Sequence, residues 1–191
     1  MKLCLSLLIT GLLMCLGCAS SLPEQKTEFL LRPQAISVPD SKPPTIGLGR
    51  VEVAPYLDHA GIAFETAPGE INIAEHNRWA DPLDFAIRRY LQVAIGQAAG
   101  LNIAGSLTAA DGVETEIDVL VHQFHGSVSG KVILVAEWQI HGSASEELQA
   151  YRQFSATQTV QGDGYAEIVR THAALLDEIA GSIAAEIRQA E

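Results

Sequence analysis

The stretch Lys131-Val132-Ile133-Leu134-Val135-Ala136-Glu137-Trp138-Gln139-Ile140-His141 decides the fold class of this chain. Every second residue in it is apolar without interruption, which is the period of a β-strand with one face in a hydrophobic core. The opposite face also carries charged and polar side chains. The pattern therefore predicts a strand that buries Val132, Leu134, Ala136, Trp138 and Ile140.

Further strands are predicted on both sides of this segment. Residues 116–122 alternate in the same way, and residues 151–160 form a strand rich in Gln, Ser and Thr. The turns predicted at residues 126–130 and 143–147 are short, so these three strands should form an antiparallel meander. Upstream, the pattern predicts a short strand from Glu28, a strand at residues 45–54, and a hairpin of residues 61–66 and 70–74 around Ala67-Pro68-Gly69.

Two amphipathic helices complete the expected fold. The first has Asp81 as a predicted N-cap, Pro82 at the first helical position and Gly100 as its stop. The last begins near Tyr165, and His172 on its apolar stripe is predicted to be a hydrogen-bonded core histidine. A mixed, mostly antiparallel sheet with two main helices predicts a single layered domain of the α+β or α/β class. The strand face above is expected to share one core with Ile87, Leu91, Ile117, Val119, Val121, Ile179 and Ile183.

Composition limits the classes of partner. The formal net charge of −11 makes nucleic acid a poor partner and disfavours binding to anionic lipid surfaces. All three cysteines lie at or before Cys18, so the folded part has no disulfide framework and no cysteine-based metal site. We expect no metal site and no cofactor.

The N-terminus reads as an export signal. Lys2 precedes a largely apolar run over residues 3–16, which is of signal-peptide length and too short to span a bilayer. The sequence Leu16-Gly17-Cys18 resembles the lipobox of bacterial lipoproteins, in which a peptidase cuts before the cysteine and the cysteine is acylated. Cys15 departs from this pattern, because leucine is usual at its position. The predicted divisions are a signal peptide at 1–17, a lipidated N-terminus and tether at 18–27, and one periplasmic domain at 28–191. The alternative is an ordinary secretory signal with a chance cysteine.

Motifs of catalysis are missing from the sequence. There is no nucleophile elbow, since Gly126-Ser127-Val128-Ser129-Gly130 lies in a β-turn context, and there is no Walker A, HExxH or EF-hand pattern. Six histidines are scattered along the chain; His122 and His125 fall on opposite strand faces unless a bulge intervenes. We therefore predict a protein that is not an enzyme and has no catalytic residues.

The stretch over residues 53–83 is dense in aromatic and charged side chains. Tyrosine, tryptophan and arginine are the usual anchors of protein interfaces. One interpretation is therefore a binding surface; the other is packing, with Trp79 as a staple before the helix and Arg78 paired with a carboxylate. Both can hold at once. The candidate partner-binding residues are Tyr56, Phe64, Arg78 and Trp79.

The same region resembles a known family, the ABC-type transport auxiliary lipoproteins. The resemblance covers nearly all of the chain after the signal. Its most specific segments are Leu48-Gly49-Arg50-Val51-Glu52-Val53-Ala54-Pro55-Tyr56-Leu57-Asp58, Gly61-Ile62, Glu70-Ile71-Asn72-Ile73-Ala74-Glu75 and Arg78-Trp79-Ala80-Asp81-Pro82-Leu83-Asp84.

This resemblance implies a lipoprotein of the outer membrane that faces the periplasm and carries acyl chains such as palmitate on Cys18. It implies partnership with an MCE-domain periplasmic protein and its inner-membrane ABC-type partners, which carry lipids between the two membranes. It also implies a compact domain like the N-terminal domain of TolB, and it leaves a homo-oligomer open. The alternative function is an outer-membrane lipoprotein that activates or scaffolds a periplasmic cell-wall enzyme.

Overall fold

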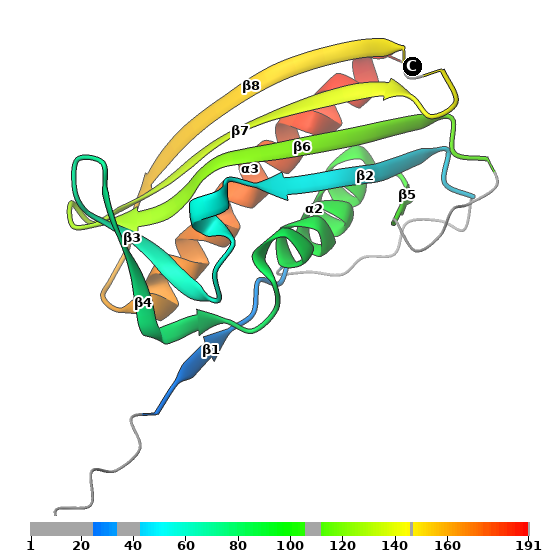
Figure 1. Ribbon diagram of the computed structural model, residues 1–191. Coiled ribbons are helices and arrows are strands. Elements are labelled where there is room, and N and C mark those ends of the chain that lie inside the picture. The colour runs from blue at the N-terminus through cyan, green and yellow to red at the C-terminus, as the bar shows by residue number, and fades with distance from the viewer. Residues whose placement is uncertain (1–24, 34–42, 106–111, 146, 191) are drawn as a thin grey trace, which may run out of the picture.

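The computed structural model describes residues 25–33, 43–105, 112–145 and 147–190 (Figure 1). In these residues a curved sheet lies over two long helices. The sheet strands are β1 (Thr27–Phe29), β2 (Ile46–Val53), β3 (Gly61–Ala67), β4 (Glu70–Trp79), β5 (Ile103–Ala104), β6 (Thr115–Ser127), β7 (Lys131–Gly142) and β8 (Leu148–Thr159). The helices are the 3-10 helix η1 (Pro55–Leu57), α2 (Leu83–Ala99) and α3 (Tyr165–Ala190).

Strand β6 is the centre of the sheet. On one side it pairs with β7 along its whole length, and β7 pairs with β8, both antiparallel, so the predicted meander is confirmed. On the other side its first half pairs with β2 in parallel, and its last two residues pair with β3. Beyond β3, the sheet continues through β4 to β1, while β5 extends it beyond β2. The sheet is mixed, as predicted, and its longest ladders are antiparallel.

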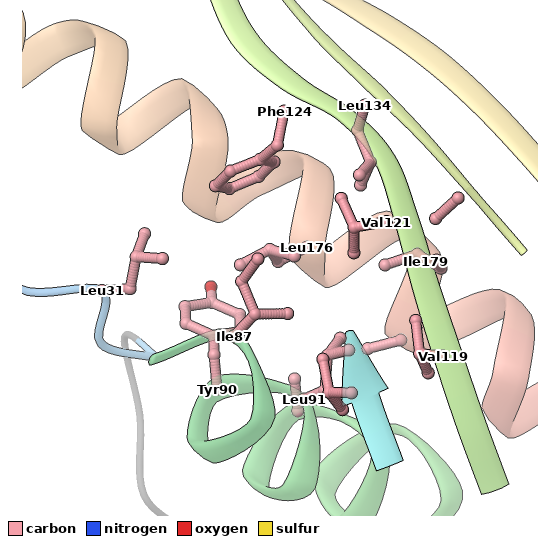
Figure 2. Close-up of a cluster of buried hydrophobic side chains, with 14 of the residues drawn as sticks. Leu31, Ile87, Tyr90, Leu91, Val119, Val121, Phe124, Leu134, Leu176 and Ile179 are labelled. Atoms are coloured by element: carbon pink, nitrogen blue, oxygen red, sulfur yellow. The ribbon is translucent and has the colours of Figure 1, made fainter. Parts of the chain in front are cut away.

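Helices α2 and α3 cover the same face of the sheet (Figure 1). Figure 2 shows how side chains of α2, α3 and β6 meet in the space between them. All twelve residues predicted for the core are buried in one cluster. This confirms the prediction made from the strand alternation and the apolar stripes of the helices. The buried Tyr90 of α2 adds a polar link, because its hydroxyl donates to Asp177 of α3 at 2.8 Å.

The predicted start of the first helix is wrong by one residue. Pro82 occupies the N-cap, and no side chain caps the helix there. Instead, Oδ2 of Asp81 lies 3.5 Å from Nη1 of Arg89, farther along the same helix. The carboxylate therefore forms an ion pair with a side chain. The end of the helix is as predicted, since Gly100 takes a left-handed conformation with φ of 72°.

The predicted turn at residues 126–130 is also shorter than expected. Gly126 and Ser127 remain in β6, where they pair with Val132 and Lys131 of β7 and with β3. A strand that gains partners on both sides keeps its extended backbone beyond a glycine. His122 and His125 were expected on opposite strand faces unless a bulge intervenes. Such an irregularity is present, because the β6–β7 register shifts between Val121 and Gln123.

Candidate docking surface at the hairpin and strand β6

Tyr56 is held against the end of β6. It lies in η1, the turn that follows β2, and its hydroxyl hydrogen-bonds to Nδ1 of His125 at 2.9 Å. The two rings meet edge to face, with centroids 6.0 Å apart. Burial raises the pKa of the Tyr56 phenol and lowers the pKa of the buried His125, so both rings are neutral at physiological pH.

Phe64 lies over the next residue of the same strand. It pairs with Gly126 of β6, and a β-carbon on that glycine would fall 2.9 Å from the Phe64 ring. The glycine therefore provides the room that the aromatic ring occupies. Phe64 also lines a surface groove of about 370 Å³ together with Thr66, Asn72, Ile73, Ala74, Glu75, His76, Asn77 and Tyr165.

Arg78 lies at the other end of β3. It pairs with Gly61 of β3 on one side and with Glu28 of β1 on the other, and it is half-buried. Its position in the middle of three strands fixes the backbone from which the guanidinium projects. The structure therefore places Tyr56 at His125 and Phe64 at Gly126, two successive residues of β6 whose side-chain directions point to opposite faces of the strand, and it places Arg78 at the far end of the hairpin.

Trp79 belongs to the core. Only 5% of it is exposed, and its ring stacks on Phe124 of β6 at 6.1 Å and meets the edge of His172 of α3 at 5.6 Å. These ring partners lie in the sheet and the last helix, and Trp79 shares the core cluster with Leu83 of the first turn of α2. Three of the four predicted contact residues remain partly accessible, and Trp79 is buried.

His172 is a fully buried core histidine, as predicted. Its Nδ1–H donates to the carbonyl of Ile168 at 2.9 Å, and its ring packs against Phe124. Burial is the main cause that lowers its pKa to about 3, far below the 6.5 of an exposed histidine. The ring is therefore uncharged in the folded protein down to strongly acidic pH.

This burial predicts an acid-sensitive fold. Between pH 6.5 and 3 the unfolded chain binds a proton at His172 and the folded chain does not, so stability falls as the pH falls, by up to about 1.4 kcal/mol per pH unit. A His172→Leu variant should lack this contribution. Urea unfolding of both proteins at pH 7.5, 6.5 and 5.5 measures it: wild type should lose more stability than the variant, and parallel losses would contradict the assignment.

Sequence reasoning missed the opposite face of the sheet. On β2, β6, β7 and β8, no described helix covers this face, and its polar side chains are bonded across strands. Asp118 receives a hydrogen bond from the Arg50 backbone, and Glu137 receives one from the Tyr151 hydroxyl. The sequence carried a signal for this face: Glu116, Asp118 and Glu137 lie at the polar positions of two neighbouring strands of the meander.

The anchor, membrane and metal predictions concern other parts of the chain. Cys18 and the predicted signal peptide lie outside the described residues. Within the described residues, no helix has the length and apolar character needed to cross a membrane. Within the same residues, no cluster of three or more His, Cys, Asp or Glu side chains has the arrangement of a metal site.

Known proteins are similar to this chain in sequence and in fold. The family model for the ABC-type transport auxiliary lipoprotein component matches residues 29–184. The intermembrane transport lipoprotein PqiC of Escherichia coli (strain K12) is 31% identical over 141 residues, which is 73% of each chain, and PqiC of Shigella flexneri matches equally well.

Solved structures agree with these matches. One, described only as an uncharacterized protein, is 28% identical, has a TM-score of 0.73, and matches 86% of this chain and 99% of its own. A Xanthomonas campestris protein of 14% identity has a TM-score of 0.67 over 83% of this chain and 92% of its own, and shows the fold alone. The family is named for a transport component and not for an enzyme. The chain belongs to the family of ABC-type transport auxiliary lipoprotein components.

Proposed function

We propose that this chain is the auxiliary lipoprotein of an MCE- and ABC-type system that moves lipids between the inner and outer membranes. The observation that carries the proposal is the 31% identity to an intermembrane transport lipoprotein across 73% of both chains. Acyl chains on Cys18 would anchor it to the periplasmic face of the outer membrane. It acts by docking to an MCE-domain protein, and it performs no chemistry on the lipid.

We assign the dock to the edge of the sheet around the hairpin, which carries Tyr56 and Phe64 on its two faces and Arg78 at its far end. Tyr56 and Phe64 are fixed on adjacent residues of β6, so they lose little side-chain freedom when a partner covers them. Phe64 also opens into a groove that a partner side chain can enter. Arg78 supplies a forked donor for a carboxylate at the other end of the hairpin.

Single alanine substitutions test this surface. Tyr56→Ala, Phe64→Ala and Arg78→Ala should each weaken capture of the purified MCE-domain partner by about tenfold or more, as expected for interface anchors. Phe85→Ala and Arg170→Ala remove an exposed aromatic and an exposed arginine from the helices, and serve as matched controls. Thermal melts of every variant separate lost binding from lost folding.

The controls should bind like wild type. If all three substitutions keep full capture, or lose it only by unfolding, the surface is packing and the interface lies elsewhere. Capture of a cell-wall synthase in place of the MCE-domain protein would favour the alternative function of an enzyme activator.

A further inference from the structure

The open face of the sheet carries more acidic than basic side chains. We use this name for the face of β2, β6, β7 and β8 that lies opposite α2 and α3 (Figure 1). Its carboxylates come from three neighbouring strands. Among the described residues of this face, Arg50 and Lys131 are the basic side chains; Arg50 lies 3.5 Å from Glu52, and Lys131 lies at the start of β7. Four carboxylates are gathered here: Glu52, Glu116, Asp118 and Glu137.

Asp118 is fixed in place by its neighbours. It lies directly over Gly49 of β2, where a β-carbon would collide with its carboxylate. Its Oδ1 accepts the backbone N–H of Arg50 at 2.5 Å, and its Oδ2 lies 3.3 Å from Nε2 of His141. Only 18% of the side chain is exposed. The glycine and the hydrogen bonds therefore hold this carboxylate in one orientation.

Glu137 is held in a similar way on the next strand. The Tyr151 hydroxyl donates to it at 2.8 Å, and Nε2 of His122 lies 3.2 Å away. The hydrogen bond from Tyr151 is the main cause that lowers the pKa of the Glu137 carboxyl. Both carboxylates are thus oriented before any partner arrives, which lowers the entropy lost on binding.

A hollow of about 210 Å³ lies between the two carboxylates. Asp118 and Glu137 occupy diagonal positions on paired strands, which places the two residues about 7–8 Å apart, with their β-carbons somewhat closer. Leu120 supplies an apolar wall and Tyr151 an aromatic one. Paired carboxylates with an aromatic ring beside them suit the planar guanidinium of arginine, which forms forked hydrogen bonds and stacks on rings.

We propose that the open face is a second docking surface, and that it receives a positively charged segment of a partner protein whose arginine side chains bind Asp118 and Glu137. Charge selects this occupant. The face repels anionic lipid and nucleic acid. It also repels a second copy of the chain, because the full sequence has a formal net charge of −11. The inference rests on this face alone and does not depend on the identity of the transport partner.

Short peptides of one charge test the proposal. The mature lipoprotein in a non-ionic detergent is titrated with a labelled peptide of six arginines, and binding is followed by fluorescence anisotropy. The double variant Asp118→Asn, Glu137→Gln should bind about tenfold more weakly than wild type. The matched control Asp84→Asn, Glu178→Gln removes the same charge from the exposed helix surface and should stay within about twofold of wild type.

Tyr151 gives an independent comparison. Tyr151→Ala removes the aromatic wall and should weaken binding of the arginine peptide, whereas Tyr151→Phe retains the ring and should bind more tightly than the alanine variant. A hexa-glutamate peptide should not bind. Thermal melts confirm that each variant is folded.

Equal weakening by the two double variants would show a non-specific attraction to an acidic chain and would overturn the proposal. No binding of the arginine peptide, or equal binding of the glutamate peptide, would do the same, as would concentration-dependent dimers that the double variant abolishes. None of these results bears on capture of the MCE-domain protein, so the two proposals can fail separately.

Discussion

Trp138→Ala is expected to lower the free energy of unfolding by about 3–5 kcal/mol, the usual cost of deleting a buried indole. Trp138 is 5% exposed and belongs to the core cluster between the sheet and the helices. It stands in the middle of β7, where β6 and β8 flank it on both sides, so the backbone cannot collapse to fill the space. Urea unfolding followed by circular dichroism measures the loss.

Trp138→Phe is the matched control. The Trp138 indole N–H is buried and finds no acceptor among the described residues, so replacing it removes an unpaired donor along with some volume. We expect this variant to lose less than about 2 kcal/mol, because a large ring still fills most of the site. An alanine variant that unfolds at the same urea concentration as wild type would show that the assigned core is wrong.

Cys18→Ser is expected to abolish stable attachment to the membrane. Acyl transfer to the chain needs the cysteine thiol, and serine offers a much weaker nucleophile. Several acyl chains hold a protein firmly to a bilayer and one chain holds it only marginally, so a protein with none should appear in the soluble periplasmic fraction. Fractionation and intact-mass analysis report the two effects.

Cys15→Leu provides the control for this experiment. It alters the other cysteine of the cleavage region to the residue usual in lipoproteins, so acylation and attachment should be retained or improved. An unmodified Cys18 in the native protein, or a Cys18→Ser protein that stays in the membrane fraction, would refute the anchor.

The main elements of the fold could be predicted because their residues repeat with a clear period. The apolar alternation around Trp138, the helical stripe with Ile87 and the helical stripe with Ile179 each match one kind of element and one buried face. The parallel pairings of β6 with β2 and β3 could not be predicted, because they join segments far apart in the sequence and leave no local pattern. The start of α2 was misplaced because Asp81 found a side-chain partner in Arg89.

The candidate sites were predicted less completely. Aromatic and charged residues of the kind found at interfaces were identified from composition. Composition cannot tell which of them are buried: the Trp79 ring packs against Phe124 and His172, whereas Tyr56 in the same stretch remains partly accessible. The open face was missed because its meaning depends on register. Asp118 and Glu137 become neighbours only when β6 and β7 pair, and they lie on the face of the sheet that no helix of the described residues covers.

Direct binding between the two purified proteins tests the central claim, that this lipoprotein docks on an MCE-domain partner. The mature lipoprotein in detergent is titrated into the periplasmic domain of the MCE protein from the same cell and followed by isothermal titration calorimetry. The account predicts a saturable isotherm that Phe64→Ala weakens and Phe85→Ala does not. A flat isotherm with both proteins folded, or binding that Phe64→Ala and Phe85→Ala reduce equally, would contradict it.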